Sequence, residues 1–312
     1  MKNRQFVYDF RKGDGKNKTL LGGKGANLCE MTQIGLPVPP GFVITTEACL
    51  DHVAQKKSGL KPELSDQIRA AMEGLEKETG KKFGDPANPL LVSVRSGAAM
   101  SMPGMMDTIL NLGLNEASVK GLIKNSKNER FVYDLYRRLI QLFGNIALDM
   151  KDEDFSIIFD NIKKENKVEE DVDLDAAALK KTCKGFLDVV KKKTGKPFPQ
   201  DPYVQLNMAV EAVFGSWMGK RAIDYRREFK ITKEMANGTA VNICTMVFGN
   251  MGNDSATGVA FTRDPANGEN RFFGEYMINA QGEDVVAGIR TPLPIRKLRG
   301  EMPEIGRASC RE

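Results

Sequence analysis

Two basic residues that stand next to small residues are the first candidates for a functional site in this sequence. Lys24 stands in the run GGKG at 22–25, and Arg95 follows the apolar run at 90–94. Glycine lets the backbone approach a ligand closely, and a cationic side chain at such a turn can bind phosphate oxygens. No GxxxxGK[ST] pattern occurs in the chain, so this is not a Walker-type loop. The two residues predict a phosphate site, although a GGKG turn alone is also compatible with a purely structural role.

A small-residue segment that ends in PGMMDT at 103–108 is the second candidate. A glycine-containing loop with accessible amides can fold over a triphosphate, and methionine side chains offer adaptable apolar contact. Asp107 and Thr108 can orient water or a metal, or can instead cap a helix, and the sequence leaves both interpretations open. We expect a nucleotide to contact the residues Gly104, Met105, Met106, Asp107 and Thr108.

The third candidate region lies later in the chain. The strand-like run ICTMVFGN at 243–250 can present backbone groups to a purine ring. Glu283 and Asp284 open an apolar, helix-like run, where acidic residues often cap a helix, and where a metal role is the alternative. We take Glu283 as a candidate for nucleotide binding.

The elements that must position these residues change in type along the chain. Residues 1–114 mix short alternating strands with glycine-rich turns and a Thr-capped helix, and 115–230 carry apolar residues at spacings of three and four, typical of helices. From about 231 to 303 the runs TAVNICTMVFGN, TGVAFTRDP and FFGEYMI predict successive antiparallel strands. We expect an α+β fold in which a helical block is inserted between two parts of one lobe. The run EIGRASCRE at 304–312 has neither periodicity nor caps, and we interpret it as a non-native tail.

Composition excludes several classes of function. The net charge of +5 is spread along the chain, which argues against a nucleic-acid-binding tail and is compatible with a cleft for a polyanion. The single histidine, His52, stands in the helix-like run ACLDHVAQKK, where a packed or solvated role is favoured, so we expect no His-based triad or His-rich metal site. The 5 cysteines form no CxxC pair that would predict zinc or a disulfide framework. The sequence has no apolar run of about 18 residues and begins with charged residues. We therefore predict a cytoplasmic protein without a membrane partner.

Taken together, these segments resemble the nucleotide-binding domain of pyruvate, phosphate dikinases. The motifs that carry the resemblance occur in the order GGKGANLCEM, GLPVPPGFVITTEAC, PLLVSVRSGAAMSMPGMMDTILNLGLN, SWMGKRAIDYRR, GNDSATGVAFTRDP and GEYMINAQGEDVVAGIRTP. The resemblance implies an ATP-grasp-type fold and reaches to about Pro303. It also implies that Lys24 and Arg95 bind ATP phosphates and that the loop 104–108 covers them. The adenine would meet the strand edge formed by Thr245, Met246 and Val247.

The same resemblance implies what the whole enzyme would do. A phosphoryl group passes from ATP and inorganic phosphate to a histidine and then to pyruvate, giving phosphoenolpyruvate, AMP and diphosphate. The histidine domain, the pyruvate-binding barrel and the ligands of Mg²⁺ are expected beyond this chain, so we expect the fragment to be inactive alone. Phosphoenolpyruvate synthases, which use water, are the alternative within enzymes, but MPGMMDT and NAQGEDVVAG favour the phosphate-using family. A stand-alone nucleotide-binding module is the alternative from another class.

Three positions depart from the family pattern. Cys244 stands where many relatives have glutamine, which puts a side-chain contact to adenine in doubt. Ala99 stands where some bacterial members have arginine, so a further phosphate charge is missing there. Gly215 replaces an arginine that commonly precedes SW, and nothing in the sequence explains this change.

Overall fold

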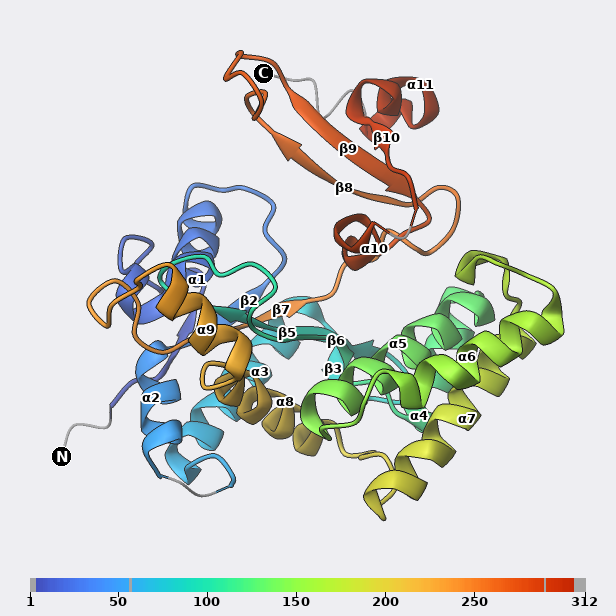
Figure 1. The fold of residues 1–312 in the computed structure, drawn as a ribbon, viewed down its shortest axis with the longest axis horizontal. Coiled ribbons are helices and arrows are strands. Elements are labelled where there is room, and N and C mark those ends of the chain that lie inside the picture. Colours follow the sequence, from blue (N-terminus) through green and yellow to red (C-terminus); the bar gives the residue numbers. More distant parts are fainter. Residues whose placement is uncertain (1–3, 56–57, 289, 306–312) are drawn as a thin grey trace. The chain divides into compact units, whose positions relative to one another are not determined.

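The described residues contain both helices and strands, with strands before and after a long all-helical stretch, which confirms the α+β class (Figure 1). The computed structural model describes residues 4–55, 58–288 and 290–305. They form two compact units, one ending at Met246 and one beginning at Val247, and each is described by itself. The division into functional parts at 114, 230 and 303 stays a prediction. Most of the expected non-native tail, from 306 to 312, lies outside the described residues.

A five-stranded antiparallel sheet is the centre of the first unit. In spatial order its strands are β1 (Val7–Asp9), β2 (Gly41–Ile44), β7 (Ala240–Thr245), β5 (Val92–Gly97) and β6 (Thr108–Leu112). The sequence predicted β7 beside the strands that follow it, but β7 pairs with β2 and β5 instead. The reason is burial: residues 240–243 are buried without alternation, as expected of a central strand covered on both faces.

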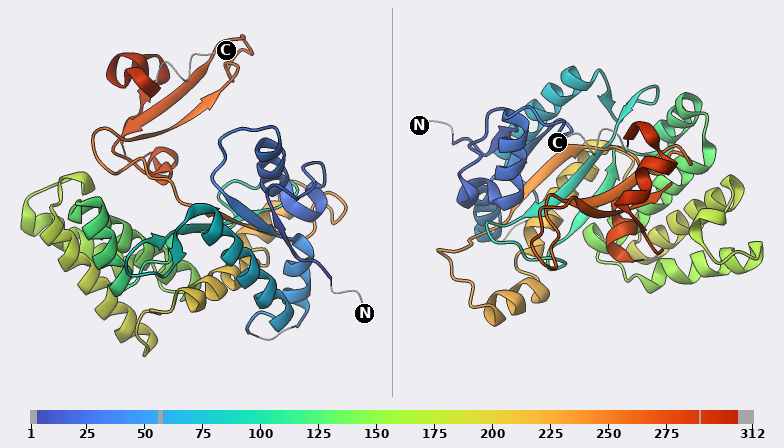
Figure 2. Two further views of the ribbon diagram at one scale, coloured as in Figure 1. Left: turned by 180° about the vertical axis from the view of Figure 1, so that it is seen from behind. Right: turned by 90° about the horizontal axis from the view of Figure 1, so that it is seen from above.

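Helices cover both faces of this sheet. Helix α1 (Lys18–Gln33) lies on one face against β2, β5 and β7, and α8 (Pro202–Ser216) lies on the opposite face (Figures 1 and 2). Two further helices pack on the sheet, namely α2 (Thr46–Gln55) against β7 and α8, and α3 (Pro62–Thr79) against β1 and β2. Because α1 covers the sheet face opposite α8 and contacts β5, its side chains can reach β5 on that face.

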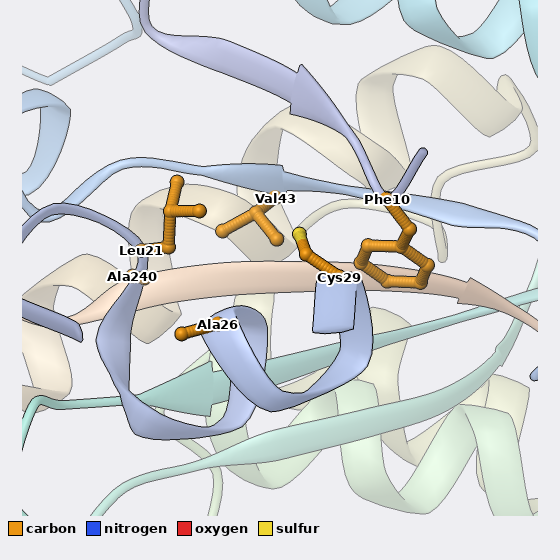
Figure 3. Packing of buried hydrophobic residues seen from close by; sticks show 6 residues of the cluster. All are labelled: Phe10, Leu21, Ala26, Cys29, Val43 and Ala240. Atoms are coloured by element: carbon orange, nitrogen blue, oxygen red, sulfur yellow. The ribbon is translucent and has the colours of Figure 1, made fainter. Parts of the chain in front are cut away.

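An apolar cluster fixes α1 on the sheet (Figure 3). Its members are all buried and come from α1, β2, β7 and the end of β1: Phe10, Leu21, Ala26, Cys29, Val43 and Ala240. Because packing density in such a core is close to that of an organic crystal, the helix has little freedom to slide or rotate. Residues between Leu21 and Ala26 are therefore held at a defined height over the strands.

The stretch 115–230 is helical, and its role as an insert between two parts of one lobe stays a prediction. It contains α4 (Glu116–Ser126), α5 (Glu129–Ala147), α6 (Glu153–Asn166), a short 3₁₀ turn η1 (Asp171–Asp173), α7 (Ala176–Thr194), α8 and α9 (Lys220–Glu228). The apolar stripe of α5, which includes Leu135, Leu139 and Phe143, is fully buried, and α5 packs against β6 and α7. A small parallel pair, β3 (Lys82–Phe83) and β4 (Pro89–Leu90), precedes β5.

The second unit is a small sheet with short helices. Strands β8 (Ala256–Phe261) and β9 (Phe273–Ile278) pair antiparallel, as the sequence predicted, and β10 (Leu293–Pro294) pairs with the other edge of β9. The helical elements are α10 (Gly282–Ala287), η2 (Ile295–Lys297) and α11 (Leu298–Glu301). Its core joins Tyr276, Leu298 and Met302, and the Tyr276 hydroxyl contacts a Glu301 carboxylate oxygen at 2.7 Å. Among the described helices of either unit, none is long and apolar enough to cross a membrane.

Candidate functional site

The GGKG run lies at a break inside α1. Gly22 has a φ of 68° and a ψ of 161°, so the helical turn before it and the helix that continues after it are separated by a kink. Only glycine adopts this conformation without strain. A Cβ at this position would lie 1.8 Å from the Gly97 carbonyl oxygen at the end of β5. The expected glycine turn that opens a helix is therefore present, and the kink brings the chain into direct contact with β5.

Lys24 is positioned by this kink and by β5. Its Nζ donates a hydrogen bond to the Ser96 carbonyl oxygen at 2.9 Å. The residue keeps solvent-accessible surface, so it lies at the edge of the sheet layer rather than in the core. Burial of the amino group, followed by the charge of Arg95, lowers the pKa of Lys24 to about 8. A lysine in this state is charged at neutral pH but gains from a nearby anion more than an ordinary surface lysine does.

Arg95 is the second cation of the site. The sequence predicted that it would project from the end of a strand, but it lies inside β5, where it faces Thr108 of β6 and Asn242 of β7. Its side chain is nevertheless exposed, because it alternates with the buried Val94 and Ser96. A position within a strand holds a guanidinium more rigidly than a position beyond it, since the backbone is fixed by neighbours on both sides.

Two polar residues around these cations were not among the sequence candidates for binding. Asn242 is fully buried, and its Nδ2 donates to the Arg95 carbonyl oxygen at 3.3 Å. The hydroxyl of buried Ser93 donates to the Cys244 carbonyl oxygen at 3.4 Å. A lone asparagine in the otherwise apolar run AVNIC was the available signal for Asn242.

Asn242 also explains why a second glycine of the GGKG run is needed. A Cβ on Gly25 would lie 2.8 Å from Oδ1 of Asn242 and 2.9 Å from Cγ1 of Val43. In the described residues this Oδ1 has no hydrogen-bond partner. The close approach of α1 to the strands at this point brings Lys24 down to the level of Ser96.

Cys244 occupies the sheet position beside the two cations. Burial raises the pKa of its thiol to about 11, although Arg95 and Lys24 act in the opposite direction. The thiol is therefore neutral at physiological pH and adds no charge to the site. The influence of Lys24 and Arg95 on this thiol shows that Cys244 lies by the cations of the site.

The segment that contains the candidate residues 104–108 is connected at both ends to strands of the site. The segment 98–107, here called the 98–107 loop, connects β5 to β6, and the Ala98 carbonyl accepts a hydrogen bond from the Gly23 amide at 2.9 Å. Thr108 is the first residue of β6 rather than part of the loop, and it pairs with Arg95. The alternative in which Asp107 and Thr108 cap a helix is therefore wrong, because a strand follows them.

The predicted adenine edge is already partly occupied by protein contacts. The amides of Thr245 and Met246 donate to the carbonyl oxygens of Pro40 and Leu91, each at 2.9 Å. A purine would have to use other groups of this segment. Val247 belongs to the second unit and is 72% exposed.

Glu283 lies in α10 of the second unit, whose placement relative to the first is not described. The neighbouring Asp284 accepts a hydrogen bond from the Gln281 amide at 2.9 Å, so the helix-capping interpretation holds for this acidic residue. The proposed nucleotide contact of Glu283 stays a prediction.

The two charged side chains at the centre of the site, Lys24 and Arg95, are both positive. Within the described residues, no carboxylate forms an ion pair with Lys24 or Arg95. Nor do three or more His, Cys, Asp or Glu side chains of the described part gather in a way that could hold a metal ion. Two cations held next to each other without a counter-ion favour the binding of an anion with more than one negative oxygen.

Comparison with known proteins agrees with this geometry. The family described as "Pyruvate phosphate dikinase, AMP/ATP-binding domain" matches residues 18–76 and 55–307. A pyruvate, phosphate dikinase of Entamoeba histolytica is 61% identical over 295 residues, which cover 94% of this chain and 33% of that protein. The one from Clostridium symbiosum is 52% identical, over 96% of this chain and 34% of that protein. A chloroplastic pyruvate, phosphate dikinase from Oryza sativa subsp. japonica is 50% identical, over 97% of this chain and 32% of that protein. The chain thus spans about a third of the length of these relatives.

Proposed function

Because the chain belongs to the pyruvate phosphate dikinase family, we propose that it is the N-terminal, ATP-binding part of such an enzyme. The observation that carries this proposal is the pair of cations Lys24 and Arg95, held together without a carboxylate partner in the described residues. Bringing two positive charges together is unfavourable, and an anion such as a triphosphate relieves the repulsion. We therefore assign Lys24 and Arg95 to the phosphates of ATP.

The remaining parts of the site have supporting roles in this proposal. The 98–107 loop joins the two strands that carry Arg95 and Thr108, so it is suitably placed to cover phosphates bound at those strands. The Thr245–Val247 segment would contact the base, and Glu283 stays a candidate for nucleotide binding. We also propose the ATP-grasp type of architecture.

The whole enzyme, in this proposal, carries out the reaction that the names of its relatives describe. One phosphoryl group of ATP is transferred to a histidine and then to the enolate oxygen of pyruvate, and a second is transferred to inorganic phosphate. The products are phosphoenolpyruvate, AMP and diphosphate. The relatives are about three times as long as this chain, so the histidine domain and the pyruvate-binding domain would belong to other parts of the full-length protein.

Magnesium would neutralise phosphate charge in such a reaction. The described residues do not provide a cluster of ligands for it, and we derive no step through a metal. A cytoplasmic location stays a prediction, and plant relatives are named chloroplastic.

The test has two parts. Titration calorimetry of the 312-residue chain with ATP should show saturable binding at one site. The same chain supplied with ATP, phosphate and magnesium should form no AMP above a protein-free blank, because in this proposal the histidine that accepts the phosphoryl group belongs to another part of the full-length protein. Absence of binding would contradict the nucleotide assignment, and steady AMP formation would contradict the fragment assignment. In the full-length protein, dependence on phosphate rather than water would separate the proposed activity from that of a phosphoenolpyruvate synthase.

A further inference from the structure

Asp107, the last residue of the 98–107 loop, is attached to three different elements. Its carbonyl accepts a hydrogen bond from the Ser96 amide of β5 at 3.4 Å. Its carboxylate Oδ1 pairs with Nη2 of Arg221 on α9 at 2.9 Å, and its amide donates to the hydroxyl of Ser216 at 3.5 Å. Asp107 therefore links the strand that carries Arg95 to the corner between α8 and α9.

The corner between α8 and α9 is itself rigid. Trp217 is 5% exposed, and the guanidinium of Arg226 lies 3.8 Å from the centre of its ring. Nη1 of Arg226 also donates to the Trp217 carbonyl oxygen at 2.9 Å, and the Ser216 hydroxyl donates to the Val213 carbonyl at 2.7 Å. Figure 1 shows α9 following directly on the end of α8. The corner can therefore act as a fixed support.

Arg221 reaches from this support to two points of the loop. Besides the ion pair with Asp107, its Nη1 approaches the Gly104 carbonyl oxygen at 3.4 Å. A planar guanidinium can hold two acceptors in a fixed relative position, whereas an ammonium group cannot impose that geometry. The side chain of Arg221 is 66% exposed, and that of Asp107 is 23% exposed. An ion pair at the surface contributes little to global stability, so its effect should be confined to the loop.

We propose that Arg221 is a positioning residue that holds the 98–107 loop in its nucleotide-binding conformation by pairing with Asp107 and Gly104. This inference rests on the proposed function, because it assigns the loop to a bound nucleotide. The other end of the loop is fixed at α1, where the Gly23 amide donates to Ala98. With Arg221 in place both ends are fixed, one by the GGKG kink and one by the α8–α9 corner. Without it, the loop samples other conformations, and the apparent affinity falls by the fraction of molecules in the competent one.

The experiment measures the loop directly. Hydrogen–deuterium exchange of the 98–107 segment is compared between the parent chain and Arg221→Ala, with Lys220→Ala as the matched control. Lys220 precedes Arg221 on α9, its side chain is 90% exposed, and it pairs with Asp224 rather than with the loop. We expect exchange in the loop to become about 3- to 10-fold faster in Arg221→Ala and to stay at the parent rate in Lys220→Ala. The thermal midpoint should be the same in all three proteins.

Two further variants separate positioning from a general loss of charge. Arg221→Lys should recover only part of the parent's protection, because one of the two acceptors is lost. In an Asp107→Asn background, Arg221→Ala should have a much smaller effect, since the ion pair is already absent. Loop exchange that is equal in parent and Arg221→Ala would overturn the proposal.

Nucleotide binding is the second readout. We expect the affinity for ATP to fall about 3- to 10-fold in Arg221→Ala, in step with the faster exchange, and to stay unchanged in Lys220→Ala. An unchanged affinity together with faster exchange would also overturn the assignment of the loop conformation to binding. If the parent chain binds no nucleotide, the proposed function fails, while the exchange of the loop still decides whether Arg221 holds it.

Discussion

The Lys24 ammonium group donates a hydrogen bond to the Ser96 carbonyl, with 2.9 Å between Nζ and the oxygen and a sequence separation of 72. Ser96 follows Arg95 directly, so this bond places the lysine beside the arginine. The kink at Gly22 and the close approach of Gly25 make the contact possible. The geometry of this pair leads to the first two predictions.

Removing either cation should weaken nucleotide binding. A charge-assisted hydrogen bond to phosphate is worth about 1.5–3 kcal/mol, so we expect Lys24→Ala and Arg95→Ala each to lower the affinity for ATP by roughly 10- to 150-fold. Calorimetry measures the change. Lys18→Ala is the control, because Lys18 is an exposed lysine at the start of the same helix. Parent-like affinity in both site variants would refute the assignment of the two residues.

The affinity for ATP should also fall as the pH rises above 8. Since burial and Arg95 lower the pKa of Lys24 to about 8, the free site loses this charge between pH 7 and 9.5. Bound phosphate would raise the pKa again, so binding takes up a proton in this range and weakens with increasing pH. In Lys24→Arg the guanidinium stays charged, and the affinity should change much less. A parent affinity that is constant from pH 7 to 9.5 would contradict the lowered pKa.

Folding should be sensitive to a side chain at Gly22. In Gly22→Ala the φ of 68° is unfavourable, and the new Cβ would lie 1.8 Å from the Gly97 carbonyl oxygen. We expect a loss of about 2–5 kcal/mol in the free energy of unfolding, measured by urea denaturation. Gly74→Ala on α3 is the control, because Gly74 is exposed and nothing lies within 4 Å of the added atom. That change should stabilise the helix by up to about 1 kcal/mol, and equal effects of the two substitutions would be inconsistent with the kink.

A buried ion cluster should make the helical block sensitive to acid. Burial would raise the pKa of Asp134, but Arg138 and Arg137 outweigh it and hold this pKa far below its usual value. Because the pKa is lower in the folded state than in the unfolded state, the stabilisation is present at neutral pH and is lost as the pH falls below about 4.

Asp134→Asn should therefore cost about 3–5 kcal/mol at pH 7, since the buried Arg137 loses the nearer of its two carboxylate partners, Asp134 rather than Asp171. Its unfolding free energy should also vary less than that of the parent between pH 5 and 3. Asp160→Asn serves for comparison, because Asp160 is 58% exposed and lies 3.8 Å from Lys163. Urea unfolding at several pH values measures both variants. Similar acid sensitivity in Asp134→Asn and the parent would argue against the cluster.

The sequence alone predicted the mixed α+β class, the helical block and the two cations of the site. These features depend on local information: apolar spacing along helices such as α5, and glycines next to Lys24. The family could be identified because its motifs occur in fixed order, and the comparisons confirmed it.

The tertiary structure decided which of these residues meet. Strand β7 could not be assigned to its sheet from sequence, because pairing with β2 and β5 joins segments about 150 to 200 residues apart, a separation that no local periodicity reports. The same pairing places Asn242 directly opposite Arg95 on the neighbouring strand. The attachment of the 98–107 loop to Arg221 likewise depends on a contact across 114 residues. Local patterns fix the elements and the residue types, whereas long-range pairing and packing bring Lys24, Arg95 and Asp107 to the same part of the sheet.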